Sequence, residues 1–139
     1  MEEGRFDFEN LKVYQKALDY VDFVYENTKH FPKTELFSLI DQFKRASISI
    51  CLNIVEGSGG SKSEFNKFLT IARRSVRECI AITEIYHRQK FIDDRVKQRS
   101  RSFCLELSKM INGLMKSLKR VLRKLRTPNS ELRTINRRE

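Results

Sequence analysis

The stretch ELFSLIDQFKRASISICLNIVEGSGG, residues 35–60, decides the fold class of this chain. Its apolar residues recur at intervals of three and four, which is the spacing of a helix with a wide buried face. The apolar set consists of Leu36, Leu39, Ile40, Phe43, Ala46, Ile50, Cys51, Ile54 and Val55. The glycine cluster Gly57, Gly59 and Gly60 is expected to end the helix. The pattern predicts a long core helix against which the rest of the chain packs.

Polar residues interrupt this apolar helix at Gln42, Arg45, Asn53 and Glu56. Buried polar groups must find hydrogen-bond partners. We therefore expect these four side chains to be structural, bonding within the bundle or across a subunit interface.

The rest of the chain also favours helices. Two Pro and five Gly are few for 139 residues, so helices can run long, and an apolar content of 40% is enough for one core. The predicted helices cover about residues 9–28, 34–56, 62–90 and 94–126. We expect an all-α, antiparallel up-down four-helix bundle over residues 1–126 and a basic, disordered tail over residues 127–139.

The helix predicted over residues 9–28 is amphipathic. Its apolar face is expected to hold Leu11, Tyr14, Leu18, Val21, Val24, Tyr25 and Thr28. Pro32 breaks the helical pattern, because proline lacks an amide proton and disfavours helix in the preceding residue. Thr34 is then the candidate N-cap of the next helix, and Glu35 complements the positive end of its dipole.

The segment GSGGSKS, residues 57–63, has a superficial likeness to a phosphate-binding loop. A P-loop requires G-x-x-x-x-G-K-[ST] after a strand, whereas here Ser61 occupies the second glycine position and a helix precedes. We therefore expect no nucleotide hydrolysis. Ser61 and Glu64 instead have the spacing of a capping box that starts a helix. The amides at that helix start are a secondary candidate for binding a phosphate of a nucleic-acid backbone.

The net charge of +10 is concentrated in the second part of the chain. Residues 1–85 carry 12 Lys and Arg against 13 Asp and Glu, whereas residues 86–139 carry 16 against 5. Such asymmetry indicates a polyanionic partner such as RNA, DNA or an acidic protein. Solubility alone would be better served by a dispersed charge.

Two groups of basic residues are candidate nucleic-acid contacts. Arg73, Arg74 and Arg77 form a cluster in the helix predicted over residues 62–90, where the alternative is pairing with a carboxylate such as Glu78 or contact with another subunit. The second group lies in the helix predicted over residues 94–126. Its members are Lys109, Lys116, Arg120 and Arg123, flanked by Lys119, Lys124 and Arg126.

The second group lies opposite a clean apolar stripe. At about 100° per residue, the stripe holds Phe103, Leu107, Met110, Ile111, Leu114, Leu118, Val121, Leu122 and Leu125. Basic amphipathic helices also bind anionic membranes or calmodulin-like clefts, and a solvated basic face without a partner is a further alternative. Because the other helices need this stripe to complete the core, we expect no membrane partner.

Three segments together resemble one known family. They are FENLKVYQKA at residues 8–17, HFPKTELFSLIDQFKRASISICLNIVEGSGG at residues 30–60, and EFNKFLTIARRSVRE at residues 64–78. The chain resembles the four-helix-bundle family of the 23S ribosomal RNA intervening-sequence proteins. The combination of Gln42, Arg45, Asn53, Glu56 and Gly57 is its most specific part.

That family is similar to the accessory variability determinant of diversity-generating retroelements, a homopentamer that binds nucleic acid and a reverse transcriptase. The resemblance implies a ring-like homo-oligomer, a pentamer, and a nucleic-acid-associated role without catalysis. Departures are Cys51, where many relatives have proline or alanine, and Arg74, where many have glycine.

Catalytic and metal chemistry find little support in the sequence. His30 and His87 have no companions that suggest a triad, and Asp93 with Asp94 is typical of a helix start. Three cysteines, Cys51, Cys79 and Cys104, lack metal-ligand spacing and are expected to be small core residues in a reducing compartment. We predict a cytoplasmic protein that is not an enzyme and has no metal or cofactor, since no signal peptide or bilayer-spanning run is present.

The sequence thus predicts an oligomeric accessory protein that binds RNA or DNA through a basic surface. The alternative is an interaction scaffold whose basic surface receives a reverse transcriptase or another acidic partner without touching nucleic acid.

Overall fold

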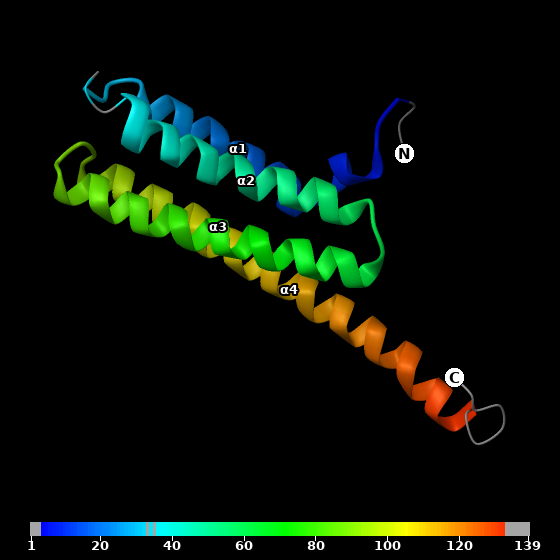
Figure 1. Cartoon of the computed structure of the whole chain (residues 1–139). Helices are drawn as coiled ribbons and strands as arrows, with labels where there is room; N and C mark the ends of the chain where they lie inside the picture. The colour runs from blue at the N-terminus through cyan, green and yellow to red at the C-terminus, as the bar shows by residue number, and fades with distance from the viewer. Residues whose placement is uncertain (1–3, 33, 35, 133–139) are drawn as a thin grey trace.

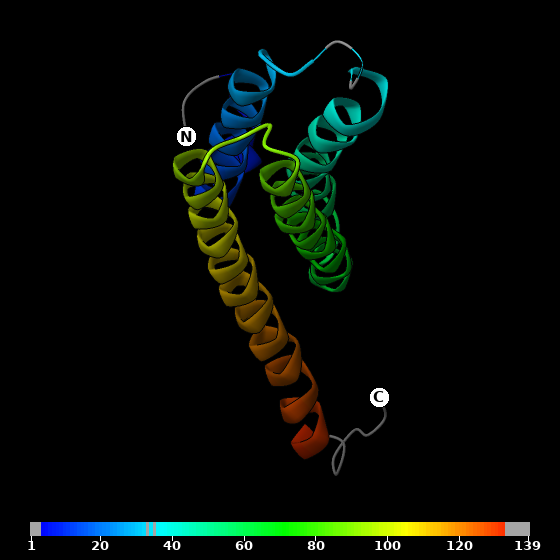
Figure 2. The ribbon, with the colours of Figure 1, turned by 90° about the vertical axis from the view of Figure 1, so that its left-hand side faces the viewer.

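Four α-helices make up the chain: α1 (Lys12–Thr28), α2 (Asp41–Ser58), α3 (Lys62–Arg88) and α4 (Asp94–Leu132). The computed structural model describes the backbone of residues 4–32, 34 and 36–132, and the side chains of these residues except 36, 37 and 126–132. Each helix packs against the next one, and α1 closes the bundle against α4. Figures 1 and 2 show the antiparallel up-down arrangement. The predicted all-α four-helix bundle is confirmed.

The first helix begins later than predicted. A 3-10 turn, η1 (Asp7–Asn10), precedes α1, and Leu11 between them is extended at φ −71° and ψ 125°. The ring of Phe8 packs edge-on against Tyr14 at 5.2 Å, and this contact bends the chain back onto α1. The predicted start at residue 9 is therefore wrong by three residues.

The second helix also starts differently. A π-helical turn, η3 (Leu36–Ile40), leads into α2 at Asp41, so Thr34 does not cap α2 as predicted. The Tyr86 hydroxyl donates to the Leu39 carbonyl, which draws this carbonyl away from a regular helical ladder. Glu35, predicted to complement the helix dipole, lies outside the described residues.

The glycine cluster does not end α2 through a left-handed residue, since Gly59 at the C-cap has φ −85° and ψ −7°. Gly57 stays inside α2, which ends at Ser58, and a Cβ at Gly57 would lie 2.6 Å from the Phe68 Cβ. Glycine thus lets α2 approach α3 closely. The predicted end at residue 56 is early by two residues.

The capping box at the start of α3 is confirmed. Ser61 Oγ accepts from the Glu64 amide at 3.1 Å, and Glu64 Oε1 accepts from the Ser61 amide at 2.9 Å. The Glu64 carboxylate therefore occupies the helix start that was the secondary candidate for a phosphate.

Helix α3 ends at Arg88 rather than at residue 90 because Lys90 adopts the left-handed conformation, φ 65°. The Phe91 amide then bonds to the Tyr86 carbonyl at 2.9 Å, a Schellman closure of the helix. Asp93 caps α4, since its Oδ1 accepts from the Val96 amide at 2.9 Å.

Helix α4 reaches Leu132, six residues past its predicted end at Arg126. The first part of the predicted disordered tail is therefore helical, although Pro128 within it has no amide proton and leaves one backbone hydrogen bond of the helix unmade. Residues 133–139 of that tail lie outside the described residues.

The core combines apolar side chains from all four helices. On α1 the buried residues are Val13, Ala17, Tyr20, Phe23, Val24 and Thr28. The predicted face was rotated from this one, because Leu18 and Tyr25 are each 41% exposed. Helix α1 carries two apolar stripes. The stripe with Tyr20 and Phe23 is the buried one, because these two rings pack against Phe103 of α4 at 5.4 and 5.3 Å.

A buried chain of hydroxyl groups joins three helices inside this core. Tyr20 of α1 bonds to Ser100 Oγ of α4 at 2.9 Å, and Ser100 bonds to Thr83 Oγ1 of α3 at 2.8 Å. Thr83 in turn donates to the Cys79 carbonyl at 2.8 Å, which leaves each hydroxyl with a partner. Burial raises the pKa of Tyr20 far above its usual value, so the phenol stays neutral.

All three cysteines are buried free thiols, in agreement with their predicted place in the core. Burial raises the pKa of Cys51 and of Cys104 to about 11, and that of Cys79 also rises. The neutral thiols are therefore poor nucleophiles.

Replacement of Gly57 by alanine should destabilise the bundle by about 1–3 kcal/mol, because the added methyl overlaps Phe68. Gly113→Ala is the matched control, since nothing lies within 4 Å of its added Cβ. That variant should be stabilised by about 0.5–1 kcal/mol, because alanine is a better helix former. Urea unfolding measures both, and equal effects at the two sites would contradict the close approach.

Candidate nucleic-acid interface

The exposed face of α4 carries six cations that we call the cationic strip. Its members are Lys109, Lys116, Lys119, Arg120, Arg123 and Lys124, all of them exposed. The opposite face is the apolar stripe, in which Leu107, Ile111 and Leu118 are buried in the core. Burial of that stripe fixes the rotation of α4, so the strip points away from the bundle. The predicted two-faced character of this helix is confirmed up to Leu118.

No carboxylate interrupts the strip along α4. The sequence has no Asp or Glu between Glu106 and Glu131. Among the described residues, no ion pair or hydrogen bond engages the side chains of Lys109, Lys116, Lys119, Arg120 or Lys124. Arg123 has a further contact, and the side chain of Arg126 lies outside the described ones. The strip therefore concentrates positive charge on one face of α4.

Helix α3 adds to this surface at one edge. Arg73 donates to Asn112 Oδ1 of α4 at 3.0 Å, which places its guanidinium beside the strip. Arg77 is one turn further on the same face of α3, whereas Arg74 is about 100° away around the helix. Glu78, the alternative partner for these arginines, accepts instead from Gln42 Nε2 at 3.2 Å. The structure thus joins Arg73 to α4 and leaves Arg74 on a different face.

Helix α4 is longer than its partner. It has 39 residues against 27 in α3, a difference of 12 residues or about 18 Å. Figures 1 and 2 show its last part running beyond the other three helices. We call residues 121–132 the α4 extension. Arg123 and Lys124 of the strip lie on it, and Leu125 is 59% exposed there.

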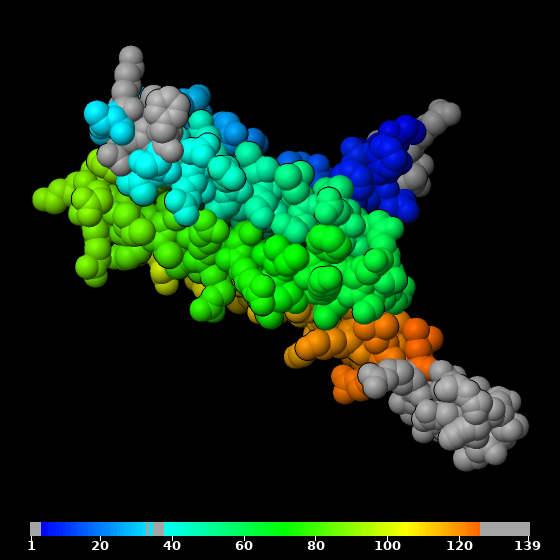
Figure 3. All heavy atoms as spheres, in the orientation of Figure 1, coloured from blue at the N-terminus to red at the C-terminus, as the bar shows by residue number. Residues whose placement is uncertain are grey.

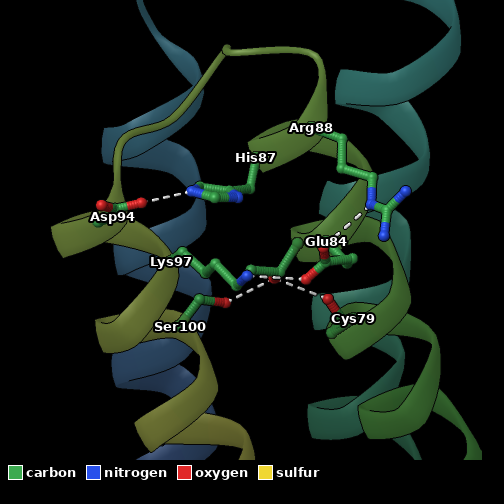
Figure 4. A network of polar contacts seen from close by, with 8 residues as sticks. Cys79, Glu84, His87, Arg88, Asp94, Lys97 and Ser100 are labelled. Atoms are coloured by element: carbon green, nitrogen blue, oxygen red, sulfur yellow. Dashed lines mark hydrogen bonds and ion pairs between the residues drawn. The ribbon is translucent and has the colours of Figure 1, made fainter.

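A polar clasp at the other end holds α3 and α4 together (Figure 4). His87 Nε2 lies 2.6 Å from Asp94 Oδ1, and Lys97 Nζ of α4 lies 3.0 Å from Glu84 Oε1 of α3. Arg88 Nε also reaches Glu84, at 3.2 Å. The hydrogen bond from Lys97, and then that from Arg88, hold the pKa of Glu84 below its usual value. The clasp anchors α4 at the end opposite its extension.

The four polar residues that interrupt α2 are not buried. Gln42, Arg45 and Glu56 are exposed and Asn53 is half-buried, because the helical turn places them beside the core face and not on it. Gln42 bonds to Glu78 of α3, Arg45 pairs with Asp41 at 3.5 Å, and Asn53 donates to the Ser49 carbonyl at 2.8 Å. The premise that they are buried was wrong.

Three of the four, Arg45, Asn53 and Glu56, line an exposed hollow instead. Its lining consists of Arg45, Ile48, Ser49, Leu52, Asn53 and Glu56. Leu52 is 59% exposed in it. Leu52 falls outside the apolar set read from the sequence, and this off-stripe position was the signal that could have revealed a second surface.

The described residues offer little support for a catalytic or metal site. His30 is exposed, and His87 is half-buried in the clasp. Within residues 4–32, 34 and 36–132, no three metal-ligating side chains come together. Over the same residues, no helix combines the length and apolarity needed to cross a bilayer.

A known protein family matches more than half of the chain. The sequence model of that family, described as 23S rRNA-intervening sequence protein, matches residues 9–113. The chain belongs to this family. The match ends within α4, before most of the cationic strip and all of the α4 extension.

A solved structure shows the same fold. It is that of a protein of unknown function from the S23 ribosomal protein family of Bacteroides thetaiotaomicron, which superposes with a TM-score of 0.68. The two chains are 23% identical over 75% of this chain and 95% of the other. No protein of curated function matches the chain. The family and the bundle predicted from the sequence are confirmed.

Loss of the clasp should change how stability depends on pH. The pKa of Glu84 is lowered in the folded state, so its ion pairs stabilise the fold above the unfolded pKa and stop doing so as pH falls through the folded pKa. Lys97→Ala should therefore destabilise the protein at neutral pH, and the difference from wild type should shrink at about pH 3. Urea unfolding at both pH values measures this.

Arg95→Ala is the control for this experiment, since it removes an exposed cation of the same helix end without touching Glu84. Its difference from wild type should be small and independent of pH. A Lys97→Ala effect that stays constant on acidification would contradict the assigned role of Glu84.

Proposed function

We propose that the protein binds nucleic acid, RNA or DNA, through the cationic strip of α4 and the adjoining Arg73 of α3. The single observation that carries this proposal is the strip itself: six exposed cations on one helix face with no carboxylate among them. A cation that only keeps a protein soluble is stabilised by a neighbouring carboxylate. A phosphate-binding face attracts phosphate more strongly when carboxylates are absent. Arg74 and Arg77 remain candidates for peripheral contacts.

The mechanism is electrostatic. Lysine and arginine side chains neutralise phosphates and release the counterions condensed on them, which favours binding at low salt. The strip offers few groups that could read base edges, since most of its members are lysines. Binding of this kind positions a nucleic acid and discriminates little between sequences. No catalytic step is required, and we propose an accessory role without enzymatic activity.

Removal of three neighbouring charges of the strip tests the proposal. In Lys116→Gln, Lys119→Gln, Arg120→Gln, the slope of log affinity against log salt should fall by about 1 for each lost phosphate contact. Fluorescence anisotropy with labelled RNA between about 50 and 200 mM salt measures this slope. The proposal fails if wild-type binding does not weaken over that range.

A charge-matched control separates the strip from net charge. Lys12→Gln, Lys90→Gln, Arg95→Gln removes three exposed cations that lie outside the strip. Its slope should stay within about 1 of wild type. Equal losses in both triple variants would show that overall charge, and not the strip, governs binding.

We also propose that the protein assembles with copies of itself through the outer face of α2, as a ring-like pentamer by its resemblance to the retroelement accessory protein. Figure 3 shows α2 and α3 forming a continuous face of the molecule. Leu52 is exposed there among polar residues of both signs, Arg45 and Glu56. Ile48 lies beside Leu52 in the hollow, so its centre is apolar and its rim polar, which is the anatomy of many protein interfaces.

Light scattering tests this assembly. The wild type should have a mass of about 82 kDa, five chains of 16.5 kDa. Leu52→Lys should reduce the mass toward that of one chain, because a charge would be buried at the interface. Leu105→Lys is the control, since Leu105 has a similar exposure of 55% on α4. A monomeric wild type, or equal losses in both variants, would contradict the proposal.

The alternative function is a scaffold that receives a reverse transcriptase or another acidic partner on the same strip. It predicts no binding to RNA or DNA and salt-sensitive binding to the protein partner. Neighbouring genes discriminate the two contexts, because a reverse transcriptase with a template repeat favours the retroelement role and flanking ribosomal RNA favours the intervening-sequence role. A cytoplasmic location stays a prediction.

A further inference from the structure

The cationic strip is straight and rigid. Lys109 and Lys124 are fifteen residues apart, which corresponds to about 22 Å along the helix axis. Helix α4 is continuous over this length, so the strip cannot follow a ligand that curls. A ligand with a straight, dense row of charge fits it best. A duplex carries about one negative charge per 1.7 Å of its axis, and it keeps that geometry without being ordered by the protein.

The strip is also wide. Lys119 and Lys124 lie on its two edges, about 140° apart around the helix, which corresponds to about 10 Å across a helix of ordinary diameter. The central members, Lys116 and Arg120, lie between these edges. A single strand presents one row of phosphates, whereas a duplex presents two rows across a groove. The major groove of B-form DNA, for example, is about 12 Å wide and admits an α-helix.

Aromatic rings are missing where a single strand would need them. Proteins that bind single strands commonly stack the bases on aromatic side chains. After Phe103, the sequence contains no Phe, Tyr, Trp or His. The α3 residues that face this part of α4 contribute Arg73 and no exposed ring. The strip therefore has no aromatic ring on which an unpaired base could stack.

We infer that the cationic strip takes a nucleic-acid duplex rather than a single strand, with its two edges on phosphates of the two strands. This inference rests on the proposed function and narrows its ligand. The two edges distinguish a duplex from a single strand. The central cations can bind phosphates of either ligand, whereas the cations of both edges bind at the same time only when two rows of phosphate are present.

Competition binding with the full chain tests the inference. The probes are duplexes of about 16 base pairs, in DNA and in RNA, and an unstructured pyrimidine strand of each, compared at equal phosphate concentration. The wild type should bind a duplex at least about tenfold more tightly than the matching strand. The DNA and RNA arms identify which duplex is preferred, and either preference supports the inference.

Two double variants of equal charge show which residues produce the preference for duplex over single strand. Lys119→Gln, Lys124→Gln removes the edges and should lower the preference for duplex to about threefold or less. Lys116→Gln, Arg120→Gln removes central charges and should weaken duplex and strand alike, with the preference retained. All four residues are exposed, and circular dichroism checks that the helices remain.

The possible outcomes test the duplex inference and the proposed function separately. Equal or tighter binding of the single strand overturns the duplex inference and leaves the proposed function standing. An unchanged preference in the edge variant also overturns it. Absence of binding to every probe overturns the proposed function as well and favours the scaffold alternative.

Discussion

The hydrogen bond between Tyr20 and Ser100 is the constraint on which the geometry of this bundle depends. Apolar side chains can slide past one another at modest cost, but a buried hydroxyl without a partner costs about 1–3 kcal/mol. Ser100 of α4 bonds both to Tyr20 of α1 and to Thr83 of α3 at less than 3 Å. Rotation or a slip of α4 would leave these hydroxyls unpaired. The register of three helices is therefore set at one point inside the core.

That fixed register has a consequence for the outer surface. Once Ser100 faces the core, the helical repeat turns Ile111 inward and Lys109 outward. The two surfaces proposed to act, the cationic strip on α4 and the hollow around Leu52 on α2, are then on different helices. Self-association and nucleic-acid binding can occur together, because neither uses the side chains of the other. Arg45, Asn53 and Glu56, three of the polar residues on which the family resemblance rests, line the hollow around Leu52.

Local features of the chain were predictable, and features that depend on distant residues were not. Ser61 and Glu64 are three positions apart, so their capping box could be predicted from spacing alone. The buried face of α1 could not, because its choice depends on Phe103 and Ser100, about 80 positions away. Gln42 was expected to be buried because its helix is apolar, although its angular position beside the stripe already argued otherwise. For the candidate site, the cations of α4 were predicted correctly as one face, whereas the link between Arg73 and Asn112 required the pairing register of α3 and α4.

The extra length of α4 alters the electrostatic surroundings of its charges. Most carboxylates of the chain belong to its first 85 residues, which carry 13 of the 18. At physiological ionic strength a charge is screened over a Debye length of about 8 Å. The α4 extension is about 18 Å long, or roughly two Debye lengths. Arg123 and Lys124 are the third and fourth residues of the extension, about 3–5 Å past its start, and so lie within one Debye length of the bundle. Only a phosphate that contacts the far end of the extension is about two Debye lengths from the acidic residues of α1 and α2.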